Sequence, residues 1–343
     1  MSLKKIAEMA GTSVATVSRV LNNPEYNCKD EGLRGRIFEA ARTLAYIPDP
    51  NARMLKKGIS GERKGYKVDI LLSRFNSLGE DVFFDEVYRY LETELIKQEC
   101  LSGSLLKAPD IASPAFAGRS VHDRADGVIV LGKCSSGIVD RLQRSYKAVV
   151  AIDRNPTEYE MDEVVCDGAK AAGIAVEYLC ELGHRRIAYI GDCNMESRYM
   201  GYYECLLRNK IPLYYEYVMS TGQTREEGYA SYDRLNSLDN PPTAVFCAND
   251  VTAVGFLERM KDKNGRKKKG VYRPAVISID DIDMAVQVSP MLTTVHIPKE
   301  DMVHVAVLML KDRLCGGHRE YMRTELPCHL MIRESSGVHV YNK

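Results

Sequence analysis

A short stretch near the amino terminus, TSVATVSRVLNN at positions 12–23, carries an unusual set of side chains. At helical spacing, one edge of it holds only Ala15, Ser18, Arg19 and Asn22. Small side chains let a helix enter a groove about 12 Å wide, hydroxyls bond phosphates, and an arginine can donate two hydrogen bonds to a guanine. A solvated face, the alternative, is normally rich in Glu and Lys, which this edge lacks. The edge therefore indicates contact with the major groove of DNA.

Three short helices can hold this edge in place. Ser2 can cap a first helix that ends at Gly11, and Ser13 can cap the second. A third helix begins near Asp30 and stops before Pro48. Two helices joined by a glycine-containing turn and closed by a third predict an all-α helix-turn-helix domain. The predicted buried stripes are Leu3, Ile6, Ala7 and Ala10, then Val17, Val20 and Leu21, then Leu33, Ile37, Ala40, Ala41 and Leu44.

Charge is unevenly distributed along the chain, although 47 basic and 47 acidic residues balance overall. Residues 1–67 hold 13 Lys and Arg against 7 Asp and Glu, so the remainder is acidic by the same margin. A basic head on an acidic body is expected when only the head meets a polyanion. An ordinary solvated surface of the same charge remains the alternative.

From Val68 onward, short apolar runs alternate with amphipathic helical stretches. This alternation predicts an α/β body with doubly wound parallel sheets. Two sheets are expected because the body is about twice the length of a five-stranded unit and its pattern restarts after Asn155-Pro156. The segment from Cys100 to Asp123 is a poor match to the strand and helix expected there.

Polar residues follow several of the apolar runs. Ligands of open α/β sheets bind at the carboxyl ends of the strands, so these residues are expected to line a cleft between two lobes. For Asp192 and Asp250, capping of the next helix is an equal alternative. The residues concerned are Ser73, Asp153, Asp192, Asn249, Asp250, Asp280 and Asp281.

Several classes of protein are disfavoured by what the sequence lacks. No GxSxG, HExxH or GxxxxGK[ST] motif occurs, so we expect no enzyme. The ten cysteines are scattered without metal-ligand spacing, so neither metal nor cofactor is expected. The seven histidines are isolated, and His184 is expected to be a structural loop residue. No apolar run could span a bilayer, which favours a cytoplasmic protein without a membrane partner.

The stretch IAEMAGTSVATVSRVLNN resembles the DNA-binding head of the LacI/GalR family of bacterial transcription regulators, and the pair Val14-Ala15 is similar to that of galactose-type repressors. The resemblance implies base contacts from Val14, Ala15 and Arg19. It implies phosphate or groove-edge contacts from Ser13, Thr16, Ser18 and Asn22.

The next stretch, YIPDPNARMLKKG at 46–58, resembles the hinge of this family, with Asp49 where Asn is usual. Here the resemblance implies that a short helix carrying Arg53 and Leu55 binds the minor groove, with the leucine as an apolar wedge between base pairs.

The body resembles the effector domain of the same family, which is related to periplasmic sugar-binding proteins. The similar stretches include DGVIVLG, PTAVFCANDVTAVGFL and PMLTTVHIP. This resemblance implies a two-lobed body that binds a sugar or sugar derivative. An ion pair between Asp153 and Arg198 without ligand is the alternative for those two residues, and Gln223 stands where some members place an aromatic residue. The implied effector contacts are Phe84, Asp153, Arg198, Asn249 and Asp280.

Together these features predict a sequence-specific transcriptional regulator of sugar metabolism genes, a repressor that binds operator DNA as a homodimer under allosteric control. The alternative is a sugar-binding protein of a transport system without DNA binding. The predicted boundaries are 1–48 for the helix-turn-helix domain, 49–67 for the hinge helix and linker, 68–161 with 296–322 for lobe 1, and 162–295 with 323–337 for lobe 2.

Overall fold

The computed structural model describes most of the chain, and within it no helix is long and apolar enough to cross a membrane. The predicted hinge contacts Arg53 and Leu55 lie outside the described residues. The described ranges are 3–22, 31–44, 65–73, 77–79, 81–113, 116, 125–153, 155–194, 196–263 and 272–337.

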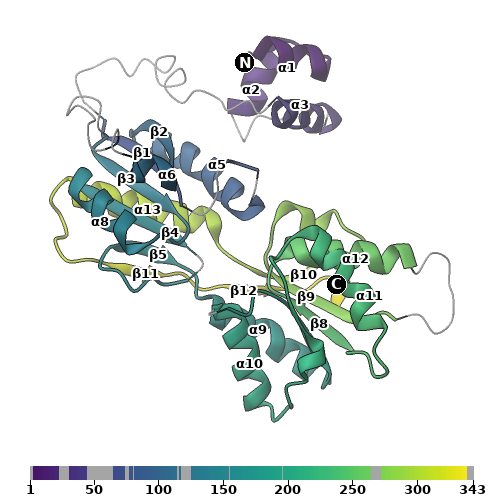
Figure 1. The fold of residues 1–343 in the computed structure, drawn as a ribbon. Coiled ribbons are helices and arrows are strands. Elements are labelled where there is room, and N and C mark those ends of the chain that lie inside the picture. The colour runs from purple at the N-terminus through teal and green to yellow at the C-terminus, as the bar shows by residue number, and fades with distance from the viewer. Residues whose placement is uncertain are drawn as a thin grey trace.

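The amino-terminal head consists of the helices α1 (Leu3–Ala10), α2 (Val14–Asn22) and α3 (Glu31–Thr43) (Figure 1). Gly11 ends α1 with a φ of +65°, a conformation that favours glycine. The amide of Gly11 donates to Glu8 O, and that of Thr12 to Ala7 O, which closes the helix end. The head has its own apolar core, and the predicted stripes are confirmed in it. Its buried members are Ile6, Ala7, Ala10, Val17, Val20, Ile37, Ala40 and Ala41, and Leu3, Leu21, Leu33 and Leu44 are partly buried.

The body contains two six-stranded sheets, and each sheet has helices on both faces (Figure 1). The first has the order β11-β5-β4-β3-β1-β2, with every pairing parallel. We call this sheet and its helices the first lobe. Its elements are β1 (Lys67–Leu72), α5 (Val82–Lys97), β2 (Leu101–Lys107), α6 (Ala108–Ala112), β3 (Gly127–Leu131), α8 (Ser136–Ser145), β4 (Ala148–Asp153), β5 (Asp162–Val165), α13 (Lys299–Leu314) and β11 (Arg323–Glu325).

The second sheet has the order β12-β10-β9-β8-β6-β7 and, with its helices, forms the second lobe. Only the edge strand β12 pairs antiparallel. Its elements are α9 (Gly168–Glu181), β6 (Ile187–Gly191), α10 (Ser197–Arg208), η1 (Tyr215–Tyr217), β7 (Val218–Ser220), α11 (Arg225–Asn236), β8 (Ala244–Cys247), α12 (Asp250–Lys263), β9 (Ala275–Asp280), η2 (Asp283–Val286), β10 (Thr293–His296), β12 (His329–Met331) and η3 (Glu334–Ser336).

The strand pairings place the lobe boundaries later in the chain than the sequence predicted. We expected the second lobe to begin at residue 162 and to resume at residue 323. Instead β5 pairs with β4, with Val165 beside Asp153, and β11 pairs with β5. Residues 162–165 are fully buried, so they form an inner strand of the first sheet. The restart after Asn155-Pro156 is therefore a loop within the first lobe, and the chain crosses to the second lobe after Val165.

The segment that matched poorly does contain a strand. β2 pairs in parallel with β1, but the register shifts between Val68 and Ile70. The carboxylate of Asp69, buried in β1, occupies this irregularity: it accepts the amide of Ser104 at 2.7 Å and the hydroxyl of Tyr146 at 2.7 Å. β2 itself is an edge strand in which only Leu106 is buried, and its sequence LSGSLLK places two serines and a glycine among the leucines, so the apolar run of a buried strand is missing.

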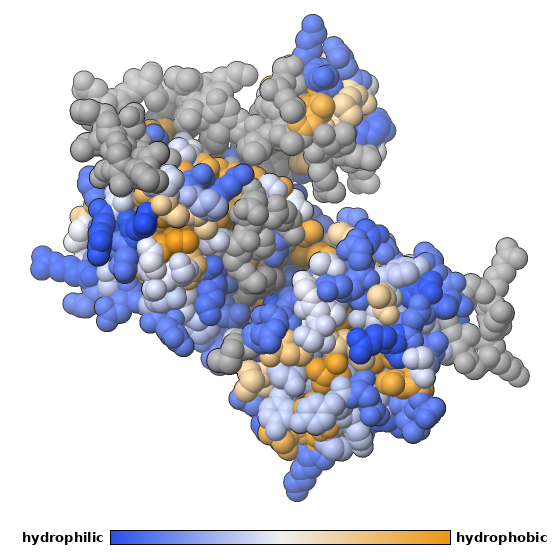
Figure 2. Space-filling model, viewed as in Figure 1, coloured by the Kyte–Doolittle hydropathy of each residue, from blue (hydrophilic) through white to orange (hydrophobic). Residues whose placement is uncertain are grey.

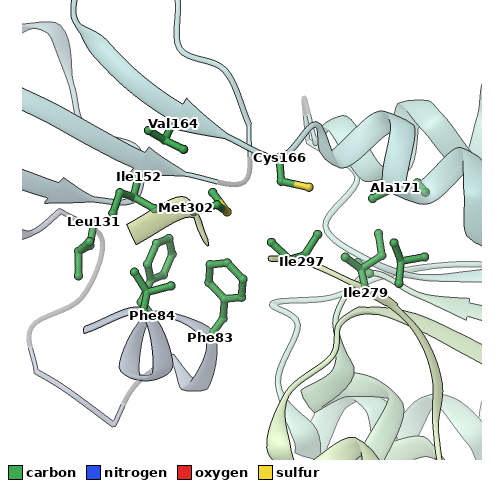
Figure 3. Close-up of a cluster of buried hydrophobic side chains, with 14 of the residues drawn as sticks. Phe83, Phe84, Leu131, Ile152, Val164, Cys166, Ala171, Ile279, Ile297 and Met302 are labelled. Atoms are coloured by element: carbon green, nitrogen blue, oxygen red, sulfur yellow. The ribbon is translucent and has the colours of Figure 1, made fainter. Parts of the chain in front are cut away.

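One apolar core extends through both lobes. In the first lobe it includes Phe83 and Phe84 of α5, and in the second it includes Ile279 of β9. Cys166 and Ile297, which lie where the chain crosses between the sheets, join these parts (Figure 3). Outside, hydrophilic residues cover much of the visible face, and apolar residues occupy separate areas between them (Figure 2).

Close packing of α11 on α12 depends on Gly255. A Cβ atom there would lie 1.9 Å from the carbonyl oxygen of Arg225. We expect Gly255→Ala to lower the free energy of unfolding by about 1–3 kcal/mol, because the helices must move apart. Gly137→Ala, on α8 with nothing near the new methyl group, should leave it unchanged or raise it by up to ~1 kcal/mol. Urea unfolding followed by circular dichroism measures both; equal effects would contradict the packing argument.

Candidate functional site

Helix α2 has the two edges that the sequence predicted. Val17 and Val20 are buried in the head, whereas Ser13, Val14, Ala15 and Arg19 are exposed, Val14 by 43%. Thr16 and Ser18 are half-buried. Asn22 ends the helix, and its side chain lies outside what the structure describes.

Ser13 fixes the start of this helix. Its hydroxyl accepts the amide of Thr16 at 3.1 Å and bonds the hydroxyl of Thr16 at 2.9 Å. The predicted cap is therefore confirmed. Because the cap orients the first turn, it also fixes the direction in which Val14 and Ala15 face solvent.

The five predicted effector residues lie in both lobes. Phe84 belongs to α5 and Asp153 ends β4 in the first lobe, while Arg198, Asn249 and Asp280 belong to the second. Four of them are buried, with Asn249 half-buried. Burial suits residues that shield a small ligand from water, and it also means that each charged side chain needs compensating contacts.

Arg198 and Asn249 are brought together by Gln223. The Arg198 guanidinium donates to Glu196 Oε1 at 2.8 Å, to the carbonyl of Ala248 at 2.8 Å and to Gln223 Oε1 at 3.0 Å. Asn249 Nδ2 donates to Gln223 O at 3.2 Å. The salt bridge of Arg198 is thus with Glu196, rather than with Asp153 as the alternative prediction had it.

Asp280 lies at the start of a tightly constrained turn. Asp280 and Asp281 have φ angles of +120° and +50°, two successive values that non-glycine residues rarely adopt. Their carbonyl oxygens accept hydrogen bonds from Lys299 Nζ at 2.6 and 2.9 Å. Lys299 therefore stabilises the turn that presents the Asp280 carboxylate.

The Asp281 carboxylate is held on the other side of this turn. His296 Nδ1 lies 2.8 Å from Asp281 Oδ2, and Arg333 donates to Oδ1 at 2.7 Å. Burial raises the pKa of Asp281, but the hydrogen bonds from His296 and Arg333 outweigh burial and keep the pKa below its usual value. Asp281 is thus an ionised structural group.

Asp250 neither lines a cleft nor caps its own helix. Its fully buried carboxylate accepts the hydroxyls of Ser278 at 2.5 Å and Thr294 at 2.6 Å, and the amide of Ile282 at 2.9 Å. It ties the start of α12 to β9 and β10. Burial, together with the nearby charge of Asp280, raises the pKa of Asp250 to about 7.

Two further expectations concern turns. Asp192 accepts the amide of Asn194 at 2.8 Å within its own turn. His184 Nδ1 lies 2.9 Å from Thr243 Oγ1, a contact between two loops. His184 is a structural residue, as expected.

Two grooves occur on the body outside this region. One, of about 1010 Å³, lies along α9 and α10 and is lined by side chains such as Lys170, Glu177 and Arg208. A smaller one, of about 270 Å³, lies beside α8. Neither of these two grooves contains any of the predicted effector residues.

Sequence reasoning missed the residues that support the site. Glu196 and Lys299 contact predicted residues directly, yet neither follows a strand nor belongs to a motif. Gln223 was noted only as a departure, but it links Arg198 to Asn249 and has a φ of +65°. The contacts of Gln223 and Lys299 join residues 18 to 26 positions apart, and no signal in the sequence marks them. Glu196 lies only two residues from Arg198 but belongs to no motif.

Comparison with known proteins gives matches over nearly the whole chain. The family model of bacterial regulatory proteins of the lacI family matches residues 2–49, and that of the periplasmic binding protein-like domain matches residues 176–336. The HTH-type transcriptional repressor CytR of Escherichia coli (strain K12) is 31% identical over 350 residues, which cover 98% of this chain and 96% of CytR.

Solved structures resemble the whole chain as well. The complex of the transcriptional regulator CelR with cellobiose has a TM-score of 0.67 at 25% identity, and the match covers 98% of this chain and 99% of CelR. The lac repressor dimer bound to operator and the anti-inducer ONPF has a TM-score of 0.66 at 20% identity, with 98% and 99% covered. At that identity the second likeness concerns the fold alone.

Asp250 makes the stability of the fold depend on pH. The pKa of Asp250 in the folded protein, about 7, lies above the ordinary value of 3.8. Between these two pH values Asp250 therefore carries a proton in the folded protein and has lost it in the unfolded chain. Ionisation therefore destabilises the fold as the pH rises through this range. Relative to wild type, we expect Asp250→Asn to gain unfolding free energy as the pH rises from about 4 to about 7, and to gain no more above that.

Thermal unfolding across this range measures the effect. Asp140→Asn, at an exposed position of α8, is the control and should differ from wild type by the same amount throughout. A constant offset for Asp250→Asn as well would mean that Asp250 is ionised in the fold at all these pH values.

Proposed function

Because the chain belongs to the LacI family of bacterial regulatory proteins, we propose that it is a repressor of sugar metabolism genes whose affinity for operator DNA changes when a small molecule binds between its lobes. The observation that carries this proposal is the exposed edge of α2, where Ala15 and Arg19 face solvent above a buried apolar edge. A helix of this kind fits the major groove.

Within this edge, we assign base contacts to Val14, Ala15 and Arg19, and backbone or groove-edge contacts to Ser13, Thr16, Ser18 and Asn22. The exposure of Arg19 supports its role, because a guanidinium needs an open approach to O6 and N7 of a guanine. Arg53 and Leu55 complete the proposal in the minor groove on the strength of the resemblance.

The small molecule is proposed to contact Phe84, Asp153, Arg198, Asn249 and Asp280. Carboxylates, an amide and a guanidinium suit the hydroxyl groups of a sugar or sugar derivative. The solved structure of the similar regulator CelR is a complex with cellobiose, which supports a carbohydrate effector. Since these residues come from both lobes, an effector that contacts all of them favours one relative orientation of the lobes.

A homodimer is proposed because the two-fold symmetry of a dimer matches the pseudo-palindromic half-sites that helix-turn-helix proteins read. The fold of this chain resembles that of the subunits in the lac repressor dimer, which supports a homodimer. The residue ranges of the units are proposed as 1–48 for the head and 49–67 for hinge and linker, with lobe crossings after residues 165, 296 and 325.

We place the protein in the cytoplasm, where its operator would be, and assign it no enzymatic activity. A sugar-binding protein of a transport system would share the two lobes. It would have no use for the folded head with its exposed helix edge, so the head favours regulation over transport.

Arg19→Ala should relax sequence preference. We expect about 1–3 kcal/mol less discrimination between the promoter DNA upstream of the gene and a scrambled duplex, because the guanine contact is lost. Lys4→Ala, which removes one exposed charge from α1, should weaken both complexes alike. Fluorescence anisotropy at fixed salt measures the six affinities of wild type and the two variants for the two duplexes. If Arg19→Ala keeps the wild-type preference for the promoter sequence, Arg19 does not contact the bases.

Asp280→Asn should abolish the effector response while leaving DNA binding intact. Asparagine tolerates the positive φ of this position but loses the charge that accepts hydroxyl donors. We expect the wild type to be stabilised by one member of a panel of sugars and sugar derivatives that includes cellobiose, by roughly 2.7 kcal/mol at a concentration of 100 Kd. Thermal-shift assays measure this, with the exposed Asp283→Asn as the control. A normal shift in Asp280→Asn would exclude Asp280 from the site.

A further inference from the structure

The ammonium group of Lys299 joins the two lobes at a buried position. Lys299 is the first residue of α13 in the first lobe and is 4% exposed. Its Nζ donates hydrogen bonds to the carbonyl oxygens of Asp280 at 2.6 Å and Asp281 at 2.9 Å, and it forms an ion pair with Glu86 Oε2 at 3.1 Å. The two carbonyls belong to the second lobe and Glu86 to the first, so one side chain bridges both.

Glu86 makes a second link to the same turn. Its carboxylate, 4% exposed on α5, accepts the amide of Asp283 through Oε1 at 3.1 Å while Oε2 pairs with Lys299. The ring of Phe83 lies 5.6 Å from Lys299 Nζ and adds a cation–π contact. Glu86 and Lys299 therefore hold residues 280–283 at both ends, and both side chains come from the first lobe.

The turn that they hold is one that the chain would otherwise avoid. Successive positive φ angles at Asp280 and Asp281 direct both carbonyl oxygens toward the same ammonium group. Such a conformation persists only when its surroundings stabilise it. Within the second lobe, Asp250 holds the turn through the amide of Ile282, and His296 and Arg333 hold the Asp281 carboxylate. The carbonyl oxygens of Asp280 and Asp281, however, are bound by Lys299 from the first lobe.

A surface ion pair nearby does not explain the link. Arg89 lies 3.9 Å from Asp283, and its side chain is 52% exposed. Exposed pairs at this distance contribute little, whereas a buried pair whose hydrogen bonds are all made resists separation. The connection between the lobes at this point therefore consists of the buried hydrogen bonds that Lys299 and Glu86 make with residues 280–283.

We propose that Lys299 and Glu86 are positioning residues that fix the turn of residues 280–283 from the opposite lobe, so that the placement of the Asp280 carboxylate depends on how the two lobes are oriented. The role of Asp280 in binding the effector rests on the proposed function. The contacts of Lys299 and Glu86 with residues 280–283, which we call the clamp, do not rest on it.

Hydrogen–deuterium exchange of the full chain, read by mass spectrometry in peptides covering residues 279–288, tests this. We expect Lys299→Met to raise the exchange rate of these amides at least tenfold, because the turn loses both hydrogen bonds that Lys299 donates to it. Lys299→Arg should restore most of the protection, since a guanidinium keeps the charge and the donors. A merely space-filling role for Lys299 would give the opposite order, with methionine nearer to wild type.

Lys311→Met is the matched control. Lys311 lies on the same helix and also donates to a carbonyl, that of Gln98 at 2.8 Å, but both residues belong to the first lobe. Its loss should leave exchange in residues 279–288 unchanged. If Lys299→Met does not fold, Glu86→Gln keeps the shape and one acceptor, and it should raise exchange in the same peptides several-fold.

The proposal is wrong if folded Lys299→Met and Glu86→Gln exchange residues 279–288 at the wild-type rate. It is also wrong if exchange rises evenly over the whole second lobe. The measurement uses neither effector nor DNA. A clamp that fails therefore leaves the proposed function standing, and an Asp280→Asn variant that still responds to effector leaves the clamp standing.

Discussion

The chain crosses between its two sheets three times, and this constraint shapes the rest of the body. The crossings follow β5, β10 and β11, and the apolar core continues through them at Cys166 and Ile297 (Figures 1 and 3). Lobes joined in this way can turn about the crossings but cannot separate. A ligand held by both lobes therefore acts on their relative orientation, which is the quantity that a regulator of this design has to control.

Buried ionisable side chains lie at the ends of strands and at the contact between the two lobes. Arg198 is satisfied by Glu196, Gln223 and a carbonyl, Asp250 by two hydroxyls and an amide, and Lys299 by Glu86 and two carbonyls. Each set specifies one local arrangement, because removing a partner leaves a buried charge, or for Asp250 a buried polar group, without its compensating contact. These networks give the candidate site its precision, whereas the apolar core gives it stability.

The sequence predicted the head almost completely. The stripes of its helices and the cap at Ser13 follow from spacing and local hydrogen bonding, both of which lie within a few residues of each other. The same holds for the α/β alternation and for Asp153 and Asp280 at the ends of their strands.

The parts that the sequence could not predict depend on distant partners. The contact between Lys299 and Glu86 joins residues more than 200 positions apart. The assignment of β5 to the first sheet is decided by its pairing with β4, not by composition. Asp250 was a candidate cap of α12, yet it is the first residue of that helix, and its partners come from β9, β10 and the turn after β9. The cap is Asn249, which accepts the amide of Thr252.

The most direct test of the account is the affinity of the full chain for promoter DNA with and without the sugar derivative that most stabilises it. Coupling between the lobes and the head predicts a change in affinity of roughly 5–150-fold, and the same factor must appear when the affinity for the sugar derivative is measured with and without DNA. Equal DNA affinity in both conditions, with the sugar derivative bound, would contradict the central claim that this chain transmits effector binding to DNA.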